Sequence, residues 1–327
     1  MKTILNREEC FALINVANIR SGLLVDHFVN SPDDIYKFDD RTAGIPILVP
    51  ANKNLFCFEE SDVFELPAQQ LLETVYSLTD QDYVGFKHAF TNFEFLARFE
   101  VKEAYKSYVD EIVQQNIDTM NYVASLKEKF PIIGAFQTRN IPHFGHEKIM
   151  QRMLEYCDHL VINPVLGPKK SGDIKVDCLS EVFAHLIRTK YEEKISFKPI
   201  FANMFYAGPR EAIHHTIMRD KIGFQQFTIG RDHAGTKDAY HPKGASALVK
   251  KLNGRLPINV IAHDGAAFCP TCNEIIIVGD CNHPSEEIKN ISGTDFRASL
   301  LERRPFRFAN QEMQLHLLEN KIEIFEP

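Results

Sequence analysis

The sequence predicts an α/β protein built around a parallel sheet, because from residue 131 onward short apolar runs alternate with helix-length segments. The apolar runs are PIIGAF, LVINPV, KPIFANMF, FQQFTIG and INVIAHD. Helices are expected from residue 143 to about 157, from 176 to about 190 and from 209 to about 221. This alternation is typical of βαβ units, whose sheets carry helices on both faces and bind ligands beyond the carboxyl ends of the strands.

The first hundred residues have a different pattern. Short runs rich in Phe, Val and Leu, such as IPILVP, NLFCFEE and DVFELPA, are punctuated by Pro, Asn and Asp, which is typical of short strands and turns. Residues 101–129 then place apolar side chains at helical intervals, so one or two helices are expected there. We predict three parts: a β-rich domain at 1–103, an α/β domain at 104–262 and a small C-terminal part at 263–327.

The composition is that of a globular protein without a polyanion-binding surface. The 327 residues are 44% hydrophobic and 25% charged, which is enough to bury a core. With 37 basic and 44 acidic residues the net charge is −7, so an anion site must be a local cluster and nucleic acid is not an expected partner. We expect no membrane association, since no run reaches about eighteen apolar residues. The odd number of cysteines, 7, favours a reducing compartment, and we expect a cytoplasmic location.

The stretch GAFQTRNIPHFGHEKIM gathers hydrogen-bond donors directly after the first apolar run. The expected strand-to-helix loop carries Gln137, Thr138, Arg139 and Asn140. His143 and His146 project from one face at the start of the following helix, where free backbone N–H groups favour an anion. The stretch therefore predicts a phosphate-binding site. Two histidines that only cap a helix are the alternative.

A second cluster, GRDHAG, follows the apolar run FQQFTIG in the same strand-then-loop arrangement. Gly230 lets the backbone approach a ligand, Arg231 can pair with an oxyanion through two nitrogens, and His233 can donate to another oxygen. Both loops are expected to open on the same edge of the sheet. The alternative is that Asp232 simply neutralises Arg231 in a structural loop.

Taken together, these motifs resemble the ATP sulfurylase (sulfate adenylyltransferase) family. QTRN, the histidine pair, YAGPRE, GRDHAG and ISGTDFR occur in the family's order and separations, and the resemblance extends from about residue 131 to 297. It implies a Rossmann-like nucleotidyltransferase domain preceded by a β-rich domain similar to PUA domains. The family joins sulfate to the α-phosphate of ATP, which gives adenosine 5′-phosphosulfate and pyrophosphate. Homo-oligomers, such as a dimer, are usual in the family.

The resemblance also implies roles for the motif residues. Gln137 and Arg139 would hold sulfate, and Thr138, Arg139 and Asn140 would act in catalysis by stabilising charge at the α-phosphate. His143 and His146 would bind the ATP phosphates. Further substrate contacts would come from Gly230, Arg231, Asp232, His233 and Ala234. Because both reactants are anions, such donors must first cancel their repulsion before sulfate attacks in line. Mg²⁺ is expected to neutralise the departing pyrophosphate.

Several positions depart from the family pattern or have a structural alternative. Pro142 stands one place later than in many relatives and Phe144 replaces a basic residue, so one weak phosphate contact is expected to be missing. The loop GPKKSGD resembles a family loop near the active site, and a solvated charge run is its alternative. His214 and His215 lie inside an expected helix, away from any glycine-rich anion loop, and are expected to be structural.

The stretch CPTCNEIIIVGDCNH combines Cys-x-x-Cys with Cys-x-His. Three thiolates and one imidazole at this spacing match a closed, structural zinc site. The predicted ligands are Cys269, Cys272, Cys281 and His283. Buried free cysteines are the alternative, although some bacterial and archaeal sulfurylases have a similar zinc knuckle. The remaining cysteines, Cys10, Cys57, Cys157 and Cys178, are expected to be buried apolar groups.

The sequence therefore predicts a sulfate adenylyltransferase with zinc and Mg²⁺ as cofactors. One alternative is a related nucleotidyltransferase with another acceptor. The other is a non-enzymatic nucleotide-binding protein built on the PUA-like domain. The acidic character of the first hundred residues argues against RNA binding by that domain.

Overall fold

The computed structural model describes residues 5–23, 57–65, 67–89, 94–231, 233–235, 239–252, 254–284, 286–319 and 323–326. Its central sheet has five parallel strands in the order β5-β4-β3-β6-β7. The strands are β3 (Ile133–Phe136), β4 (His159–Ile162), β5 (Ile195–Phe197), β6 (Gln226–Ile229) and β7 (Asn259–Ala262). The predicted α/β class with a parallel sheet is confirmed.

The direction of strand addition reverses at β3. The chain runs outward from β3 through β4 to β5 and then returns to the other side of β3 as β6. Strands β3 and β6 are therefore neighbours, with Gly134 opposite Gln226. In doubly wound sheets the ligand crevice lies beyond the carboxyl ends of the strands at such a point. The loops QTRN and GRDHAG both leave the sheet there.

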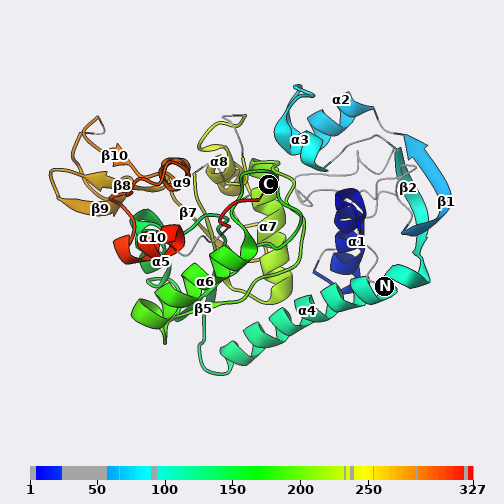
Figure 1. Cartoon of the computed structure of the whole chain (residues 1–327), viewed down its shortest axis with the longest axis horizontal. Coiled ribbons are helices and arrows are strands. Elements are labelled where there is room, and N and C mark those ends of the chain that lie inside the picture. The colour runs from blue at the N-terminus through cyan, green and yellow to red at the C-terminus, as the bar shows by residue number, and fades with distance from the viewer. Residues whose placement is uncertain are drawn as a thin grey trace.

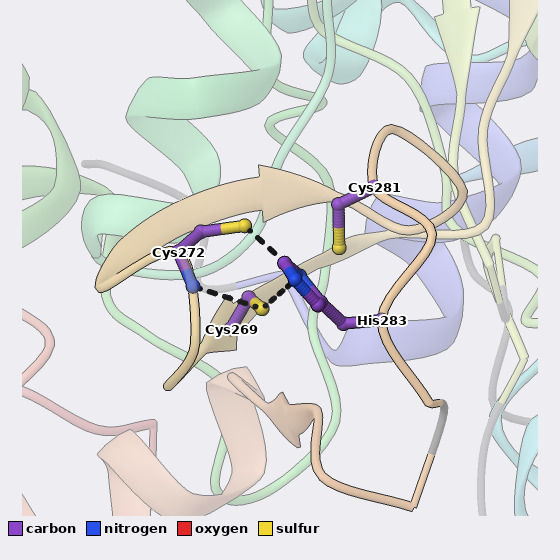
Figure 2. Close-up of side chains that lie close together, drawn as sticks. All are labelled: Cys269, Cys272, Cys281 and His283. Atoms are coloured by element: carbon purple, nitrogen blue, oxygen red, sulfur yellow. Dashed lines mark hydrogen bonds between the residues drawn. The ribbon is translucent and has the colours of Figure 1, made fainter.

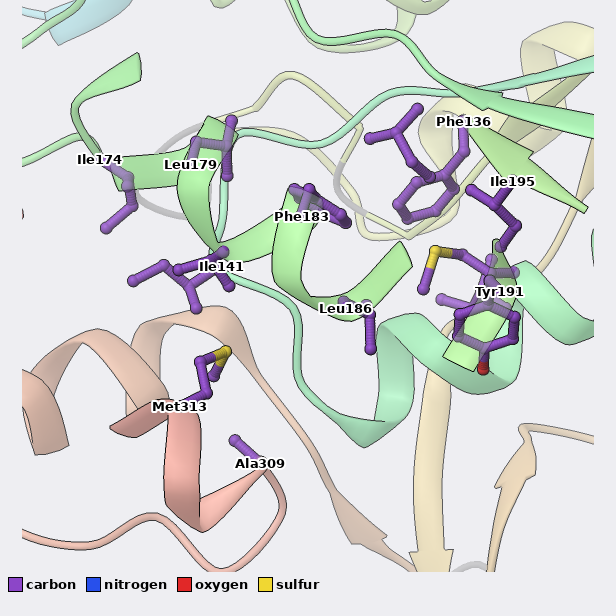
Figure 3. Packing of buried hydrophobic residues seen from close by; sticks show 14 of the residues in the cluster. Phe136, Ile141, Ile174, Leu179, Phe183, Leu186, Tyr191, Ile195, Ala309 and Met313 are labelled. Atoms are coloured by element: carbon purple, nitrogen blue, oxygen red, sulfur yellow. The ribbon is translucent and has the colours of Figure 1, made fainter. Parts of the chain in front are cut away.

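Helices cover both faces of this sheet, and each face has its own core. The covering helices are α4 (Glu103–Lys127), α5 (Phe144–Met153), α6 (Val176–Leu186), α7 (Pro209–Ile222) and α8 (Gly244–Lys251). Successive β4 residues alternate between the cores: Leu160 and Ile162 pack with Phe183 of α6, whereas Val161 packs with the α4, α7 and α8 side. Figure 3 shows the first core, where Phe136 and Phe183 lie among aliphatic side chains. This alternation follows from the two-residue period of a strand.

One expected strand lies earlier than predicted. The stretch KPIFANMF is irregular apart from an isolated bridge between Ile200 and Val165, and the strand is β5, just before it. Pro199 has no N–H for a ladder. Side chains bind the backbone instead: the Phe201 N–H donates to the Asn116 side chain, at 2.9 Å. The single long helix α4, by contrast, confirms the helical pattern of 101–129.

The described part of the N-terminal region mixes helices with one antiparallel pair of strands. These elements are α1 (Arg7–Arg20), β1 (Phe58–Glu65), α2 (Ala68–Leu71), the π-helical turn η2 (Leu72–Tyr76), α3 (Val84–Ala89) and β2 (Glu94–Val101). Helix α1 was not expected; a reciprocal capping box between Asn6 and Glu9 starts it. The run IPILVP lies outside the described residues, and the PUA-like architecture stays a prediction. No helix among the described residues is long and apolar enough to cross a membrane.

The C-terminal part begins with a small antiparallel sheet of order β10-β8-β9. Its elements are β8 (Ala266–Cys269), β9 (Glu274–Ile277), β10 (Lys289–Asn290), α9 (Gly293–Leu301) and α10 (Gln311–Glu319). Figure 1 shows this sheet at the opposite end of the molecule from α1 and β1. Ile277 and Phe296 enter the same core as α5 and α6. Met313 of α10 belongs to this core too (Figure 3). This part therefore shares the packing of the α/β domain.

A substitution at Gly134, in the central strand β3, can test how tightly the sheet packs against its neighbours. A Cβ there would lie 2.7 Å from the Cys157 sulfur, so Gly134→Ala should lower the free energy of unfolding by about 1–3 kcal/mol through overpacking. Cys157→Ala removes that sulfur, and the double variant should lose less stability than the two single variants combined. Urea unfolding of the four proteins measures the coupling. Strict additivity would contradict the contact.

Candidate active site and metal centre

Arg139 joins the two predicted anion loops at the carboxyl edge between β3 and β6. Its Nη2 donates to the Gly235 carbonyl oxygen at 3.1 Å, and its guanidinium carbon lies 5.1 Å from the centre of the Tyr206 ring. The other terminal nitrogen, Nη1, is buried without a hydrogen-bond partner, 3.8 Å from Asp173 Oδ2. The predicted proximity of the loops is thus confirmed, and one donor of Arg139 remains available.

Asp173 is the carboxylate around which the cations at this edge gather. It is 1% exposed and accepts a hydrogen bond from the Tyr206 hydroxyl at 2.6 Å. Lys170 Nζ lies 3.3 Å away, and Arg297 Nη1 lies 3.8 Å away. Burial opposes ionisation, but the charge of Arg139, the Tyr206 hydrogen bond and the charge of Lys170 together hold the pKa of Asp173 below its ordinary value. The carboxylate is therefore charged.

Tyr206 is held in a left-handed backbone conformation, with φ of 57°. The Glu211 carboxylate accepts the N–H groups on either side of it, from Phe205 at 2.8 Å and Ala207 at 2.9 Å. The Tyr83 hydroxyl donates to the Tyr206 carbonyl oxygen at 2.5 Å. Such a conformation is costly for a bulky residue and persists where its surroundings fix it. The N-terminal region therefore helps to hold the ring beneath Arg139.

His143 and His146 form a reciprocal capping box at the start of α5. His143 Nδ1 accepts the His146 N–H at 3.2 Å, His146 Nδ1 lies 3.4 Å from the His143 nitrogen, and the rings stack at 3.8 Å. Burial lowers the pKa of His143 to about 4 and that of His146 well below its ordinary value, so both rings are neutral at pH 7. A neutral ring that accepts at Nδ1 carries its proton on Nε2. Capping thus leaves each Nε2–H able to donate to a ligand.

The second loop is closely packed against neighbouring side chains. A Cβ at Gly230 would lie 3.0 Å from His263 Cε1, so the glycine permits a close approach. Arg231 is exposed, with Nη1 3.5 Å from Asn290 Oδ1 of β10. Ala234 has a left-handed φ of 53°. Asp232 lies outside the described residues.

His215 does not lie away from the GRDHAG loop, and that prediction was wrong. His215 Nδ1 is 3.1 Å from His233 Nε2, and His215 Nε2 is 3.4 Å from Glu211 Oε1. The His233 Nε2 therefore contacts helix α7. His214 and His215 are both buried, which agrees with a structural role, but helical spacing could not reveal that α7 packs behind this loop.

Sequence reasoning gave little weight to several residues at this edge. They are Lys170, Asp173, Tyr206, His263 and Arg297. Tyr206 and Arg297 lie in the motifs YAGPRE and ISGTDFR, which were used only for the resemblance. Lys170 and Asp173 lie in the loop that could equally have been a solvated charge run. These residues lie in motifs that the sequence already shows, but only the fold reveals that Lys170, Tyr206 and Arg297 lie beside the carboxylate of Asp173.

The four predicted metal ligands converge at the β8–β9 hairpin (Figure 2). The ligand atoms of Cys269, Cys272, Cys281 and His283 all lie within 4.8 Å of one another. His283 Nδ1 is 3.4 Å from the Cys269 sulfur and 3.3 Å from the Cys272 sulfur. A tetrahedral zinc site with ordinary bond lengths has sulfur and nitrogen ligands about 3.5 Å apart. The Cys272 N–H lowers the pKa of the Cys269 thiol to about 7, which favours the thiolate that a metal needs. A Cys3His cluster that could hold a metal ion is thus present.

The other cysteines are free. Cys57, Cys157 and Cys178 are buried, and burial raises the pKa of each thiol to about 12. Cys10 is half-buried. The prediction of buried apolar groups is confirmed for the first three.

The fold fits the Rossmann-like class that includes nucleotidyltransferases and kinases, because the loops QTRN and GRDHAG leave the parallel sheet at the point where the strand order reverses. The ATP-sulfurylase family model matches residues 110–309. The chain therefore belongs to the ATP-sulfurylase family.

Individual relatives agree with this assignment. A sulfate adenylyltransferase from Hyperthermus butylicus is 41% identical over 171 residues, which are 52% of this chain and 44% of that protein. A sulfate adenylyltransferase from Persephonella marina is 29% identical over 339 residues, covering 94% of this chain and 82% of that protein. Such relatives support sulfate adenylyltransferase activity. Among solved structures, the hexameric APS kinase from Thiobacillus denitrificans matches 61% of this chain and 38% of its own, with a TM-score of 0.46 and 15% identity, too low to carry an argument.

The neutral state of His143 predicts a pH dependence of stability. Its pKa falls from 6.5 to about 4 on burial, so between these values the unfolded chain binds more protons than the folded one. Stability should therefore fall as the pH drops from 6.5 to 4, and His143→Asn, which keeps an N-cap, should weaken this dependence. Urea unfolding at several pH values measures both slopes. Equal slopes in parent and variant would contradict the buried neutral imidazole.

Proposed function

We propose that this chain joins sulfate to the α-phosphate of ATP by direct in-line attack, giving adenosine 5′-phosphosulfate and pyrophosphate. A sulfate oxygen would form the new bond to the α-phosphorus while the bond from that phosphorus to the bridging oxygen breaks. The proposal is supported chiefly by the cluster of Arg139, Lys170 and Arg297 at the sheet edge of an ATP-sulfurylase family member. Sulfate carries its own nucleophilic oxygen, so no covalent enzyme intermediate is needed.

The residues of the QTRN loop would supply positioning and electrostatic stabilisation. Gln137 and Arg139 would bind sulfate through their side-chain N–H groups, and the Arg139 donor Nη1 is buried without a hydrogen-bond partner. Thr138 and Asn140 would act at the α-phosphate, with Arg139 between them. The Asn140 N–H donates to Thr138 Oγ1 at 3.1 Å, which fixes the turn of the loop. Preset donors of this kind stabilise developing charge without reorganisation.

The histidines and the second loop would bind the nucleotide phosphates. His143 and His146 would act as neutral Nε2–H donors at a helix N-terminus, since burial keeps both uncharged. From the second loop we propose Gly230, Arg231, Asp232, His233 and Ala234 as substrate contacts. For His233 the contact would come from Nδ1 or the backbone, because Nε2 faces His215.

Mg²⁺ would arrive with ATP and neutralise the β- and γ-phosphates as they leave together. Asp173 is a poor ligand for it, because Tyr206, Lys170 and two guanidiniums already surround its oxygens. The phosphates themselves would therefore hold the ion. The protein would contribute the orientation of those phosphates.

The remaining expectations rest on the family resemblance. We propose a PUA-like architecture for residues 1–103, a catalytic domain at 104–262 and a zinc-bearing part at 263–327. We propose a homo-oligomer, such as a dimer, because homo-oligomers are usual in the family. Free cysteines suit a reducing compartment, which supports a cytoplasmic location.

Zinc is proposed as a structural ion at the Cys3His cluster. Four protein ligands would fill a tetrahedron and leave no position for substrate, and the cluster lies between β7 and α9. The ion would hold the hairpin and, through it, the start of α9.

Metal analysis should find about one zinc per chain, as expected for a single tetrahedral site. Cys272→Ser should lose zinc and lower the melting temperature more than it lowers activity at a permissive temperature. Cys10→Ser, outside the cluster, serves as the control and should keep its zinc. A metal-free protein of full thermal stability would sink the structural role, as would total inactivity in a Cys272→Ser variant as stable as the parent.

Pyrophosphate release from ATP and Mg²⁺ should depend on sulfate. Molybdate, a similar tetrahedral dianion, should replace sulfate but yield AMP, because its mixed anhydride hydrolyses at once. A coupled pyrophosphate assay with each anion, and with none, measures this, and chromatography identifies the nucleotide product. Turnover that is indifferent to both anions would refute the proposed function.

A further inference from the structure

We propose that Arg297 is a second guanidinium of the sulfate site, held in place with Arg139 by the carboxylate of Asp173. The inference rests on the proposed function and adds a substrate-binding residue to it. Arg297 lies on α9, 158 positions after Arg139 in the chain, counted from their residue numbers. It would donate to a different sulfate oxygen from those bound by Gln137 and Arg139.

The geometry around Asp173 is nearly symmetrical. Arg139 Nη1 lies 3.8 Å from Oδ2, and Arg297 Nη1 lies 3.8 Å from Oδ1. These distances are too long for hydrogen bonds, and both Nη1 atoms are buried without a hydrogen-bond partner. Buried donors are nearly always satisfied in folded proteins, and exceptions call for an explanation. Two unsatisfied guanidinium donors beside one carboxylate are suited to bind a small oxyanion.

The local charge matches the proposed ligand. Arg139, Lys170 and Arg297 lie within 4 Å of a single carboxylate, which leaves an excess of two positive charges. Sulfate at pH 7 carries two negative charges. Burial and the nearby charge of Arg139 both lower the pKa of Arg297, so the cations repel one another. Asp173 reduces this repulsion, and a bound dianion would remove the rest.

The fold fixes Arg297 against the QTRN loop. The Ser292 hydroxyl accepts the Asp295 N–H at 3.0 Å and caps α9. A Cβ at Gly293 would lie 2.9 Å from the Asn140 side chain, so the start of α9 packs directly on that loop. Phe296, 2% exposed, anchors the next turn in the core. The Arg297 side chain keeps 22% of its surface exposed, which leaves it accessible to a small anion.

A purely structural role is the competing explanation: Arg297 would then only neutralise Asp173. That role predicts a loss of stability with no preference between substrates. Sulfate binding predicts a selective loss of sulfate affinity and of the ability to distinguish a dianion from a monoanion. The two explanations differ in what kinetics would measure.

The test compares Arg297→Gln and Arg297→Lys with the parent, in assays of sulfate-dependent pyrophosphate release. Arg297→Gln should raise the KM for sulfate about 10- to 100-fold, the range expected for one charge-assisted hydrogen bond, and change the KM for ATP less than about twofold. Arg297→Lys should recover part of the loss. Perchlorate, a tetrahedral monoanion, should compete with sulfate better in Arg297→Gln than in the parent. Arg304→Gln, an exposed residue just after α9, is the matched control and should behave as the parent.

An unchanged KM for sulfate in a folded Arg297→Gln variant would overturn the inference and leave the proposed function standing. Equal losses for sulfate and ATP would also overturn it. If Arg297→Gln fails to fold, the KM for sulfate and the competition by perchlorate are measured in Arg297→Lys instead, and values equal to those of the parent would overturn the inference. If the parent itself shows no sulfate-dependent turnover, the proposed function fails. Calorimetric titration of sulfate into the parent and Arg297→Lys, each with an inert ATP analogue, then tests anion binding without turnover. Equal sulfate affinities in the two proteins would refute the role of Arg297 in anion binding.

Discussion

The buried carboxylate of Asp173 is the constraint on which the rest of the site depends. It lies 1% exposed among Arg139, Lys170 and Arg297, with the Tyr206 hydroxyl 2.6 Å away. Without a central negative charge, these cations would repel one another and turn toward solvent. With it, they remain close together while some of their donors stay free. An enzyme that must bring two anions together needs this arrangement before its substrates arrive.

The surroundings of Asp173 link distant parts of the chain. Tyr206, whose ring lies beneath Arg139, is fixed by Glu211 of α7 from one side and by Tyr83 of the N-terminal region from the other. The start of α9 packs on Asn140. Tyr83 from the N-terminal region, Glu211 of α7 and the start of α9 therefore all contribute to the geometry of one edge of the sheet. The left-handed backbone conformation of Tyr206 is unfavourable by itself, and several independent contacts stabilise it.

Neutral histidines complement this charged centre. The capping box of His143 and His146 uses each Nδ1 for the backbone, and burial keeps both rings uncharged at pH 7. The helix N-terminus supplies partial positive charge at the same place. Full charge is thus concentrated at the arginines, whereas the proposed phosphate contacts are neutral donors. This division limits repulsion within a site that already holds three cations.

The sequence alone determined the α/β class, the two loops at the sheet edge and the Cys3His cluster, because strand and helix periodicity, loop chemistry and ligand spacing are local properties. It placed the strand at KPIFANMF too late, since the side chains that bind that backbone come from α4 and α7. It placed His215 away from the loop that His215 contacts, and it gave no sign that Arg297 lies beside Lys170 and Asp173, which belong to another motif. Only the tertiary structure could unite these residues, because residues far apart in the chain meet through packing of helices and sheet, which no local pattern encodes.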